Sequence, residues 1–546
     1  MKKILLGGYS YYCLESDERL YPSIFDNNIA PILKFLYTNE NYKFSLYITY
    51  NQILWLESKR PEIVKLIDIL LKRKSLTLLF SSSFQALADI IQQKEILLQS
   101  EAMALKIRQV FKAKADGFFA FEGFWQSDFV PLFSKADISY SLVPINRIEK
   151  ELKYPFIMSK NLQKMLIIPT SIYHNATLNR FLESKSSLDK FLTQYSKEID
   201  SREYEIVFFN IDDFVKKGKD FSLFINSLFS VYKNCCFYTT DDISDIGKAY
   251  FLPSARYTAD SFEIFDFLYS NQEQITKLAR INYIEELLNL NKKKKKDFPA
   301  LDTQFKKLTT SMQFIPGYYD LSTNEELYKS YLGILKELLV DIEKPPRFDM
   351  LTYSYETIKN KNNISFLDLG DATIKEIGDF RNLINLLHGG YLFKDMVAVP
   401  QGKTLKVFSK HNQFSFLDKS ITQTKKKYTL IAESFCDLKL EIKKEYTFKN
   451  SQEIELQIEL KNTSNLPISF TYSLLNSING IKDFSTSEDT NTIFNIYLAT
   501  AKKKAITLRS DPGFKVSYDK NKNLLASWDI VCKENQSYKI KFKVSF

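Results

Sequence analysis

A lone carboxylate follows a short apolar segment in the first half of the chain. Residues 117–121 carry no charge and are typical of a buried strand, and Glu122 comes directly after them, just before Trp125. A carboxylate at the end of a buried strand costs free energy unless it is paired or used in chemistry. Glu122 is therefore a candidate functional residue. The alternative is that it begins the next helix, with residues 126–128 as ordinary first-turn positions.

The other residue types that do chemistry leave few alternatives to carboxylates. The three histidines lie far apart and form no recognisable pairing with a cysteine or a carboxylate: His174, His388 and His411. The sequence thus offers few residues for a His-based metal site or a Ser-His-Asp mechanism, and we expect no metal. Gly7-Gly8 is the only candidate phosphate loop, and it lacks both a GxGxxG pattern and a GK[ST] ending. We therefore expect no nucleotide or other cofactor.

Length and composition indicate a large globular protein. A chain of 546 residues, 45% of them hydrophobic, is too long for one core, and we expect about two to four domains. The net charge of +10 comes largely from small lysine clusters. The largest, at 292–296, follows a helix-like pattern and indicates a solvated helix end, the alternative being a site for an anionic partner. Because these lysines are not interleaved with arginines and aromatics, we expect no nucleic-acid partner.

Cysteine usage and apolar runs bear on the compartment. The five cysteines form no CxxC and no metal-ligand spacing, which favours a reduced, cytoplasmic location. The apolar run at residues 4–6 is too short for a signal peptide and is better interpreted as the first strand. No window approaches the ~18 consecutive apolar residues of a membrane span, so we expect no membrane partner.

Short apolar runs alternate with amphipathic segments up to about residue 255. Strands are expected at 3–7, 44–50, 76–80, 117–121, 139–143, 166–169, 206–210 and 236–239, and helices at 23–36, 62–71, 91–111, 128–133, 188–195 and 221–232. Repeated βα units imply a parallel sheet covered by helices, as an open doubly wound sheet or a closed barrel. In both, a ligand lies at the carboxyl ends of the strands.

The pattern changes twice after residue 255. Apolar residues recur at helical spacing over 262–290 and 327–342, so residues 256–345 are expected to form a helical domain. From residue 346 strand alternation dominates, as in 438–443, 453–460 and 538–546. We expect residues 346–546 to form an antiparallel β-sandwich with one buried face and one face rich in Lys and Glu.

The segment around Glu122 resembles the nucleophile motif of glycoside hydrolase family 57, the α-amylases and 4-α-glucanotransferases. That motif has the form G-x-W-x-x-E-x-x-W, and Gly117, Phe119, Glu122 and Trp125 occupy its places, with Phe for the first Trp and Gly123 for the common Arg. The resemblance covers the whole chain. It implies an incomplete (β/α)7 barrel, then a helical segment completing the cleft, then a C-terminal β-sandwich, for residues 1–255, 256–345 and 346–546.

The resemblance also implies a second catalytic carboxyl. The family's acid/base Asp lies in a sequence resembling Phe-His-Asp-Asp-Gly-Glu, and residues 208–214 here read FFNIDDF, which makes Asp212 the best match and Asp213 the alternative. A retaining glycosidase needs two carboxyls ~5–5.5 Å apart, one ionised to attack the anomeric carbon and one protonated to release the leaving oxygen. The resemblance implies that Glu122 is the nucleophile and Asp212 the acid/base.

The groups around these carboxyls differ from the family's. Tyr9 and Tyr11 stand where the family has the histidines of His-x-His-x-Pro, and Gln85 stands where it has the Glu of Gly-Phe-Tyr-Glu-Pro. Tyr318 lies in a stretch that the family fills with Trp and His. Phenols and an amide still bind and stack on a sugar, but they alter the electrostatics that keep one carboxyl protonated and one ionised.

Three hypotheses follow. The chain is an active retaining enzyme on α-glucans with a modified shell, Glu122 and Asp212 as catalytic residues, and Tyr9, Tyr11, Gln85, Trp125 and Tyr318 on the substrate. Alternatively, it is a catalytically silent relative that binds a glucan, such as a maltooligosaccharide, or a protein through the old cleft. In the third, both carboxylates only begin helices or turns, and the resemblance is confined to the fold.

Overall fold

A computed structural model gives the fold of most of the chain. It describes residues 3–86, 93–120, 125–136, 138–145, 154–171, 178–199, 204–232, 235–243, 249–252, 254–255, 268, 272–293, 299–314, 321–340, 342, 345–346, 348–350, 353–359, 363–368, 373–379, 384–385, 391–401, 404–409, 414–415, 422–424, 427–434, 440–450, 453–477, 481–486, 493–498, 504–513, 515–518 and 524–545. Glu122, Tyr318, the three histidines and residues 294–296 lie outside these ranges.

The chain divides into two compact units. The first comprises residues 1–281 and 299–324, and the second comprises residues 282–298 and 325–546. The boundaries at 255 and 345 that the sequence suggests remain predictions.

Parallel strands make up the centre of the first unit. β1 (Lys3–Tyr9) pairs with β2 (Phe44–Tyr47), β9 (Tyr204–Asn210) and β10 (Cys236–Tyr238), and β2 pairs with β3 (Leu76–Leu79). A second sheet has the order β4 (Gly117–Phe119), β6 (Tyr140–Ile145), β8 (Gln163–Ser171), β7 (Phe156–Lys160), with only β7 antiparallel. A parallel bridge between Phe80 and Phe118 links the two sheets.

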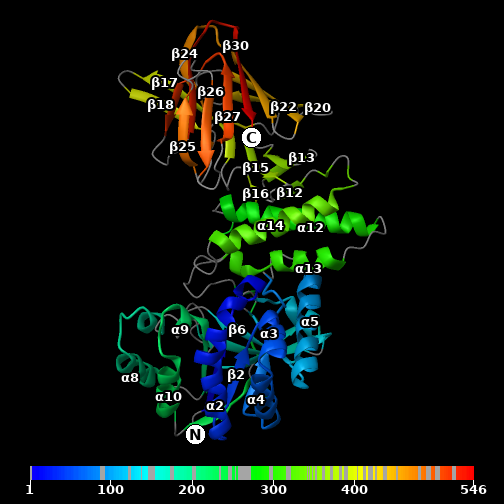
Figure 1. Cartoon of the computed structure of the whole chain (residues 1–546), viewed down its shortest axis with the longest axis vertical. Helices are drawn as coiled ribbons and strands as arrows, with labels where there is room; N and C mark the ends of the chain where they lie inside the picture. The colour runs from blue at the N-terminus through cyan, green and yellow to red at the C-terminus, as the bar shows by residue number, and fades with distance from the viewer. Residues whose placement is uncertain are drawn as a thin grey trace. The chain divides into compact units, whose positions relative to one another are not determined.

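Helices cover these strands (Figure 1). The first-unit helices are α1 (Tyr21–Ile24), a π-helix (Phe25–Ile29), α2 (Ala30–Thr38), α3 (Tyr50–Lys59), α4 (Pro61–Lys72), α5 (Gln93–Phe111), α6 (Phe129–Ser134), α8 (Leu188–Ile199), α9 (Asp212–Lys216), α10 (Phe221–Val231) and α13 (Pro299–Leu308). Two more helices, α12 (Gln272–Lys293) and α14 (Leu321–Leu338), begin in the first unit and end in the second.

Glycine allows β1 to run through a crowded core. A Cβ on Gly7 would lie 2.4 Å from the ring of Phe208 and 2.5 Å from the backbone oxygen of Ser45. The ring of Tyr9 lies 5.1 Å from that of Phe119 and 5.8 Å from that of Phe208, centroid to centroid. Aromatic pairs at such distances add stability beyond the area they bury. The side chains of β1, β4 and β9 therefore form one aromatic core.

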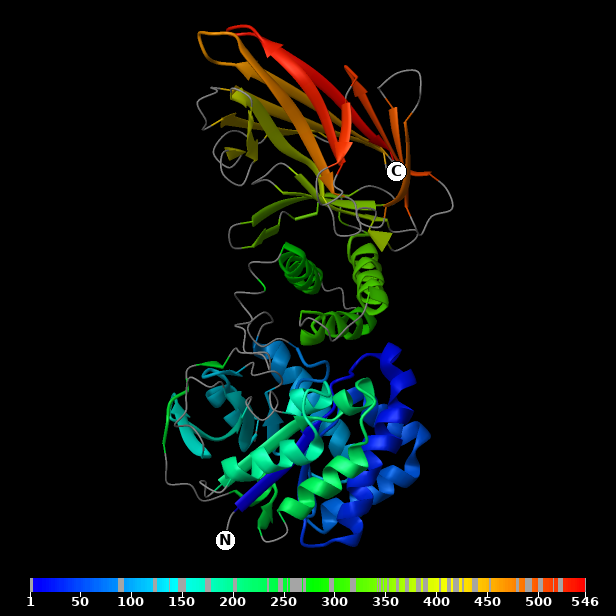
Figure 2. The ribbon, with the colours of Figure 1, turned by 90° about the vertical axis from the view of Figure 1, so that its left-hand side faces the viewer.

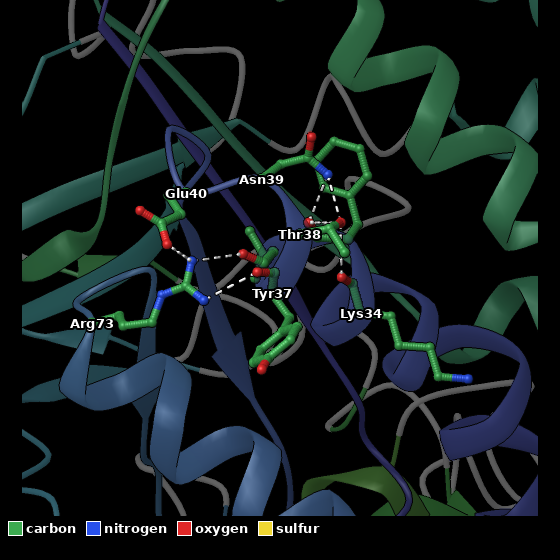
Figure 3. A network of polar contacts seen from close by, with 8 residues as sticks. Lys34, Tyr37, Thr38, Asn39, Glu40 and Arg73 are labelled. Carbon is green, nitrogen blue, oxygen red and sulfur yellow. Dashed lines mark hydrogen bonds and ion pairs between the residues drawn. The ribbon is translucent and has the colours of Figure 1, made fainter.

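Arg73 ties the end of α4 to the end of α2 (Figure 3). Its guanidinium donates to the backbone oxygens of Tyr37 at 3.0 Å and Leu36 at 3.5 Å, and it lies 3.3 Å from the carboxylate of Glu40. The last carbonyls of a helix lack partners within the helix, and a cation there also meets the negative end of the helix dipole. Arg73 thus caps α2 from outside it.

The second unit contains two antiparallel sheets (Figure 2). Among the described residues, one sheet comprises β12 (Phe348–Met350), β13 (Tyr353–Lys359), β14 (Asn363–Asp368), β15 (Thr373–Asp379), β16 (Ile384–Asn385), β17 (Tyr391–Gln401), β18 (Thr404–Ser409), β24 (Ile468–Ser477), β28 (Lys515–Tyr518) and β29 (Leu524–Cys532). The other comprises β19 (Phe414–Ser415), β20 (Thr422–Thr424), β21 (Lys427–Ser434), β22 (Leu440–Asn450), β23 (Glu453–Asn462), β25 (Ile481–Thr486), β26 (Ile493–Leu498), β27 (Lys504–Asp511) and β30 (Ser537–Ser545). The rings of Trp528 on β29 and Phe542 on β30 meet edge to face at 5.9 Å, so the two sheets contact each other.

The mixed α/β class with a parallel sheet and C-terminal antiparallel sheets is confirmed. The expected strand at 44–50 is shorter than predicted, because Thr49 caps α3 and Tyr50 is already helical. Helix α3 itself was not expected. Closure of the parallel strands into a seven-membered barrel remains a prediction.

Two short strands, β5 (Trp125–Gln126) and β11 (Ser254–Ala255), pair antiparallel in the first unit. Among the helices that the structure describes, none is both long enough and apolar enough to cross a membrane.

Candidate functional site

Asp212 lies where β1 and β9 end. In the parallel register of these strands Tyr9 is opposite Asn210, so the loop after β1 and the first turn of α9 meet at one edge of the sheet. The backbone N–H of Ile211 donates to the oxygen of Tyr9 at 2.9 Å, and the backbone N–H of Asp212 donates to Oδ1 of Asn210 at 3.0 Å. These bonds fix the position of the Asp212 backbone at the carboxyl ends of the strands.

The carboxylate of Asp212 accepts hydrogen bonds from the loop after β1. Ser10 Oγ lies 2.8 Å from Oδ1 and 2.9 Å from Oδ2, and the backbone N–H of Tyr11 donates to Oδ2 at 2.7 Å. The side chain of Asp212 is completely buried. Its two oxygens are thus held by protein donors and not by solvent.

A hydrogen-bond chain from α3 sets the direction of the Ser10 hydroxyl. Thr49 and Gln52 form the capping box of α3, in which Gln52 Oε1 accepts from the backbone N–H of Thr49 at 2.9 Å. The amide nitrogen of Gln52 must then face Ser10, and it donates to Ser10 Oγ. Since Ser10 Oγ accepts from Gln52, its hydrogen goes to Asp212.

Burial controls the protonation of Asp212. Removal from water, with a smaller effect of the Asp213 carboxylate, raises the pKa of the carboxyl to about 7, although the hydrogen bonds from Tyr11 and Ser10 lower it. A carboxyl with this pKa exists in both forms near neutral pH. It can therefore give and take a proton, which general acid–base catalysis requires.

The tyrosines after β1 differ in exposure. Tyr9 and Tyr11 are buried, and Tyr12 is half-buried. The hydroxyl of Tyr11 donates to that of Tyr12 at 3.2 Å, with ring centroids 4.4 Å apart. Burial, with the charges of Asp212 and Asp213, raises the pKa of Tyr11 well above its ordinary value. Tyr11 and Tyr12 lie beside Asp212, but Tyr11 is completely buried and has no surface that a ligand could contact.

Gln85 occupies a strained position after β3. Its φ of 53° lies in the left-handed region, which costs of order 1 kcal/mol or more for a residue other than glycine. Its side-chain nitrogen donates to the hydroxyl of Tyr47 at 3.2 Å, while its Oε1 is buried without a hydrogen-bond partner. Such strain with an unsatisfied acceptor is common at functional sites. It gives Gln85 a capacity to accept one more hydrogen bond.

Trp125 is completely buried. Its ring packs edge to face on Phe129 at 5.7 Å, and its Nε1–H is buried without an acceptor. Stacking of a sugar on this ring requires displacement of the groups that cover it. Of the expected site residues, the structure brings together Tyr9, Tyr11 and Asp212. Glu122 and Tyr318 lie outside the described residues, so the distance between the carboxyls of Glu122 and Asp212 stays a prediction.

Sequence analysis missed the residues that hold Asp212. Ser10 donates directly to Asp212, and Gln52 acts on it through the hydroxyl of Ser10. Both side chains are uncharged, so nothing in the sequence marks them as candidates. Thr49-x-x-Gln52 matches the capping-box pattern, which marks the start of a helix. That pattern was a usable signal for α3, although not for the link from Gln52 to the site.

Comparison with known proteins links this fold to one family. Residues 7–199 match the model of glycosyl hydrolase family 57. A segment of 173 residues is 21% identical to Alpha-amylase 1 of Dictyoglomus thermophilum and covers 31% of this chain. That segment spans only 25% of the length of the curated relative.

Solved structures extend the likeness to the whole chain. The crystal structure of 4-alpha-glucanotransferase from Thermococcus litoralis superimposes with a TM-score of 0.71 over 100% of this chain and 99% of that one, at 11% identity. At this identity the likeness concerns the fold. A branching enzyme of the family from Pyrococcus horikoshii gives a TM-score of 0.46 at 10% identity over 62% of this chain and 88% of that one. The resemblance to glycosyl hydrolase family 57 that the sequence predicts is thus confirmed for residues 7–199.

Proposed function

We propose that the chain is a glycoside hydrolase family 57-like protein of α-glucan metabolism, of the retaining 4-α-glucanotransferase or α-amylase type, with a modified active-site shell. One observation carries the proposal: the carboxyl of Asp212 is completely buried at the ends of β1 and β9, and this burial raises its pKa to about 7. An acid/base catalyst needs such a pKa to work near neutral pH. The ligand would be an α-glucan or maltooligosaccharide, and the compartment the cytoplasm.

In this proposal Asp212 protonates the leaving glycosidic oxygen while Glu122 attacks the anomeric carbon. Asp212 then takes a proton from water, giving hydrolysis, or from a sugar hydroxyl, giving transfer. Tyr9, Tyr11, Gln85, Trp125 and Tyr318 are the proposed substrate-binding residues. The first four are buried as placed, so a sugar could contact them only after the groups that cover them move. A (β/α)7 barrel over residues 1–255, a helical domain over 256–345 and a β-sandwich over 346–546 would carry the substrate site. Asp213 is the alternative acid, because its side chain is half-buried and Asp212 is not exposed at all.

A second candidate is a catalytically inactive relative that binds glucan, or a protein partner, through the same region. The bonds to Asp212 favour it, because both carboxylate oxygens are already occupied by Ser10 and Tyr11. An acid held in this way must exchange a protein hydrogen bond for one to the substrate. Stability of the loop after β1 would then be the function of Asp212.

Incubation with maltoheptaose and chromatography of the products tests the proposal. The wild type should shorten or lengthen the oligosaccharide, while Glu122→Gln and Asp212→Asn should each abolish the reaction without loss of folding, because an amide cannot act as nucleophile or acid. Asp213→Asn decides which aspartate is the acid. Asp68→Asn, which changes a half-buried carboxylate on α4 that forms an ion pair with Lys72, is the matched control. An inactive wild type that still binds maltoheptaose would support the second candidate.

A further inference from the structure

Tyr12 is the least buried residue of the loop that follows β1. Of residues 9–13, all of them described, Tyr12 alone has a half-buried side chain, while the other four are buried. Tyr9, with 6% of its surface exposed, and Tyr11, with 0%, cannot reach a ligand as placed. Among these five residues, Tyr12 is therefore the one whose side chain has appreciable surface for contact with a bound molecule.

The backbone of Tyr12 is held from two directions. Its carbonyl oxygen accepts from Thr49 Oγ1 at 2.7 Å and from the hydroxyl of Tyr21 at 3.3 Å. The next carbonyl, of Cys13, accepts from Nδ2 of Asn51 at 2.7 Å. A side chain on such a fixed loop loses little freedom when it binds a ligand, which favours affinity.

The hydroxyl of Tyr12 has one hydrogen left to donate. Tyr11 is completely buried, so its hydroxyl hydrogen needs an acceptor within the protein, and it donates to the oxygen of Tyr12 at 3.2 Å. The oxygen of Tyr12 therefore acts as acceptor on that side. Its own hydrogen is therefore not used in that bond and is available to another acceptor.

The charges around Tyr12 determine what kind of ligand suits it. Burial, then the carboxylates of Asp212, Asp17 and Asp213, raise the pKa of Tyr12 to about 12, although the hydrogen bond from Tyr11 lowers it. The phenol thus stays neutral and donates at any physiological pH. Because Asp17, Asp213 and the ionised fraction of Asp212 repel anions, a phosphorylated or carboxylated sugar would bind poorly, whereas an uncharged hydroxyl is a suitable acceptor.

We infer that Tyr12 donates a hydrogen bond to a hydroxyl oxygen of an uncharged saccharide, with Tyr11 behind it as a positioning residue. The inference rests on the proposed function, since it names a further binding residue of the same site. It also differs from the sequence expectation, which placed Tyr11 on the substrate.

Calorimetric titration with maltoheptaose tests the inference. Tyr12→Phe, which keeps the ring, should raise Kd about three- to tenfold, the effect of one lost hydrogen bond. Tyr11→Phe should raise it less, because Tyr11 acts only through Tyr12. Tyr37→Phe, in a half-exposed tyrosine on α2, is the matched control and should leave Kd unchanged. Millimolar inorganic phosphate should not compete, and competition would overturn the assignment of a neutral ligand.

Two outcomes separate this inference from the proposed function. A wild type that binds no maltoheptaose at millimolar sugar overturns the proposed function itself. A wild type that binds, with Tyr12→Phe within twofold of it, overturns only the role of Tyr12. If Tyr12→Phe unfolds because the hydroxyl of Tyr11 loses its acceptor, the double variant Tyr11→Phe/Tyr12→Phe removes both partners and gives the same test.

Discussion

Ser10 Oγ lies 2.8 Å from one carboxylate oxygen of Asp212 and 2.9 Å from the other, across 202 positions of sequence. Gln52 donates to the same hydroxyl, so Ser10 is the middle of a chain of donors that ends on Asp212. The protonation of Asp212 therefore depends on a helix cap that makes no contact with it.

Asp212→Asn should change how stability depends on pH. The folded-state pKa of about 7 lies above the ordinary aspartate value of 3.8, so the protonated carboxyl favours the folded state. This contribution is fully present below about pH 4 and is lost as pH rises through about 7, an effect of at most about 4 kcal/mol. Urea unfolding at several pH values should show the wild type losing stability over this window relative to the variant. Parallel curves would mean that the folded pKa of Asp212 is ordinary.

Gln52→Glu should raise the pKa of Asp212 further. A glutamate keeps the oxygen that accepts from the backbone N–H of Thr49, but when ionised it cannot donate to Ser10, and it adds a like charge near Asp212. We expect an upward shift of roughly one pKa unit or more. Carboxyl carbon shifts in an NMR titration measure it. Gln109→Glu, at an exposed position on α5, is the control; an equal shift there would rule out the donor chain as the cause.

Trp125→Ala should destabilise the protein strongly. The ring is completely buried against Phe129, and truncation of such a residue costs about 3–5 kcal/mol. Trp125→Phe, which keeps an aromatic ring, should cost less. Denaturant midpoints of both variants measure the difference. A loss below about 1 kcal/mol for the alanine variant would show that the ring is not packed in solution, and would return it to the candidates for sugar stacking.

Arg73→Ala should loosen the end of α2. The guanidinium satisfies the carbonyls of Leu36 and Tyr37, and because it is partly exposed we expect a loss of about 1 kcal/mol. Glu40→Gln removes only the ion pair of a carboxylate that is 80% exposed and should change the unfolding free energy little. Thermal unfolding compares the two. An equal effect of both variants would assign the stability to the ion pair and not to the cap.

Much of the fold could be predicted from the sequence because its elements carry clear periodicity. The helix expected at 62–71 is α4, at Pro61–Lys72, and the strand expected at 206–210 is β9, at Tyr204–Asn210. The expected strand at 538–546 is β30, at Ser537–Ser545. Apolar residues at regular spacing are enough for such elements, since burial of one face decides them.

The site was harder to predict because its contacts are long-range and involve uncharged groups. Asp212 could be named from its match to a family motif, but nothing local marks Ser10 as its partner. Helix α3 was missed because residues 50–59 mix buried polar and apolar side chains, among them Asn51 and Gln52, whose partners lie in the loop after β1. Tertiary hydrogen bonds of this kind leave no periodic trace in the sequence.

The pairing of β1 has a consequence for how the protein is made. β1 (Lys3–Tyr9) pairs along its whole length with β9, which begins at Tyr204. A ribosome adding about 5–20 residues per second needs roughly 10–40 s to supply the roughly 200 residues between them. During that interval β1 lacks both β9 and β10, and a high contact order of this kind slows folding. Asp212 therefore meets Ser10 only when that delayed pairing is complete.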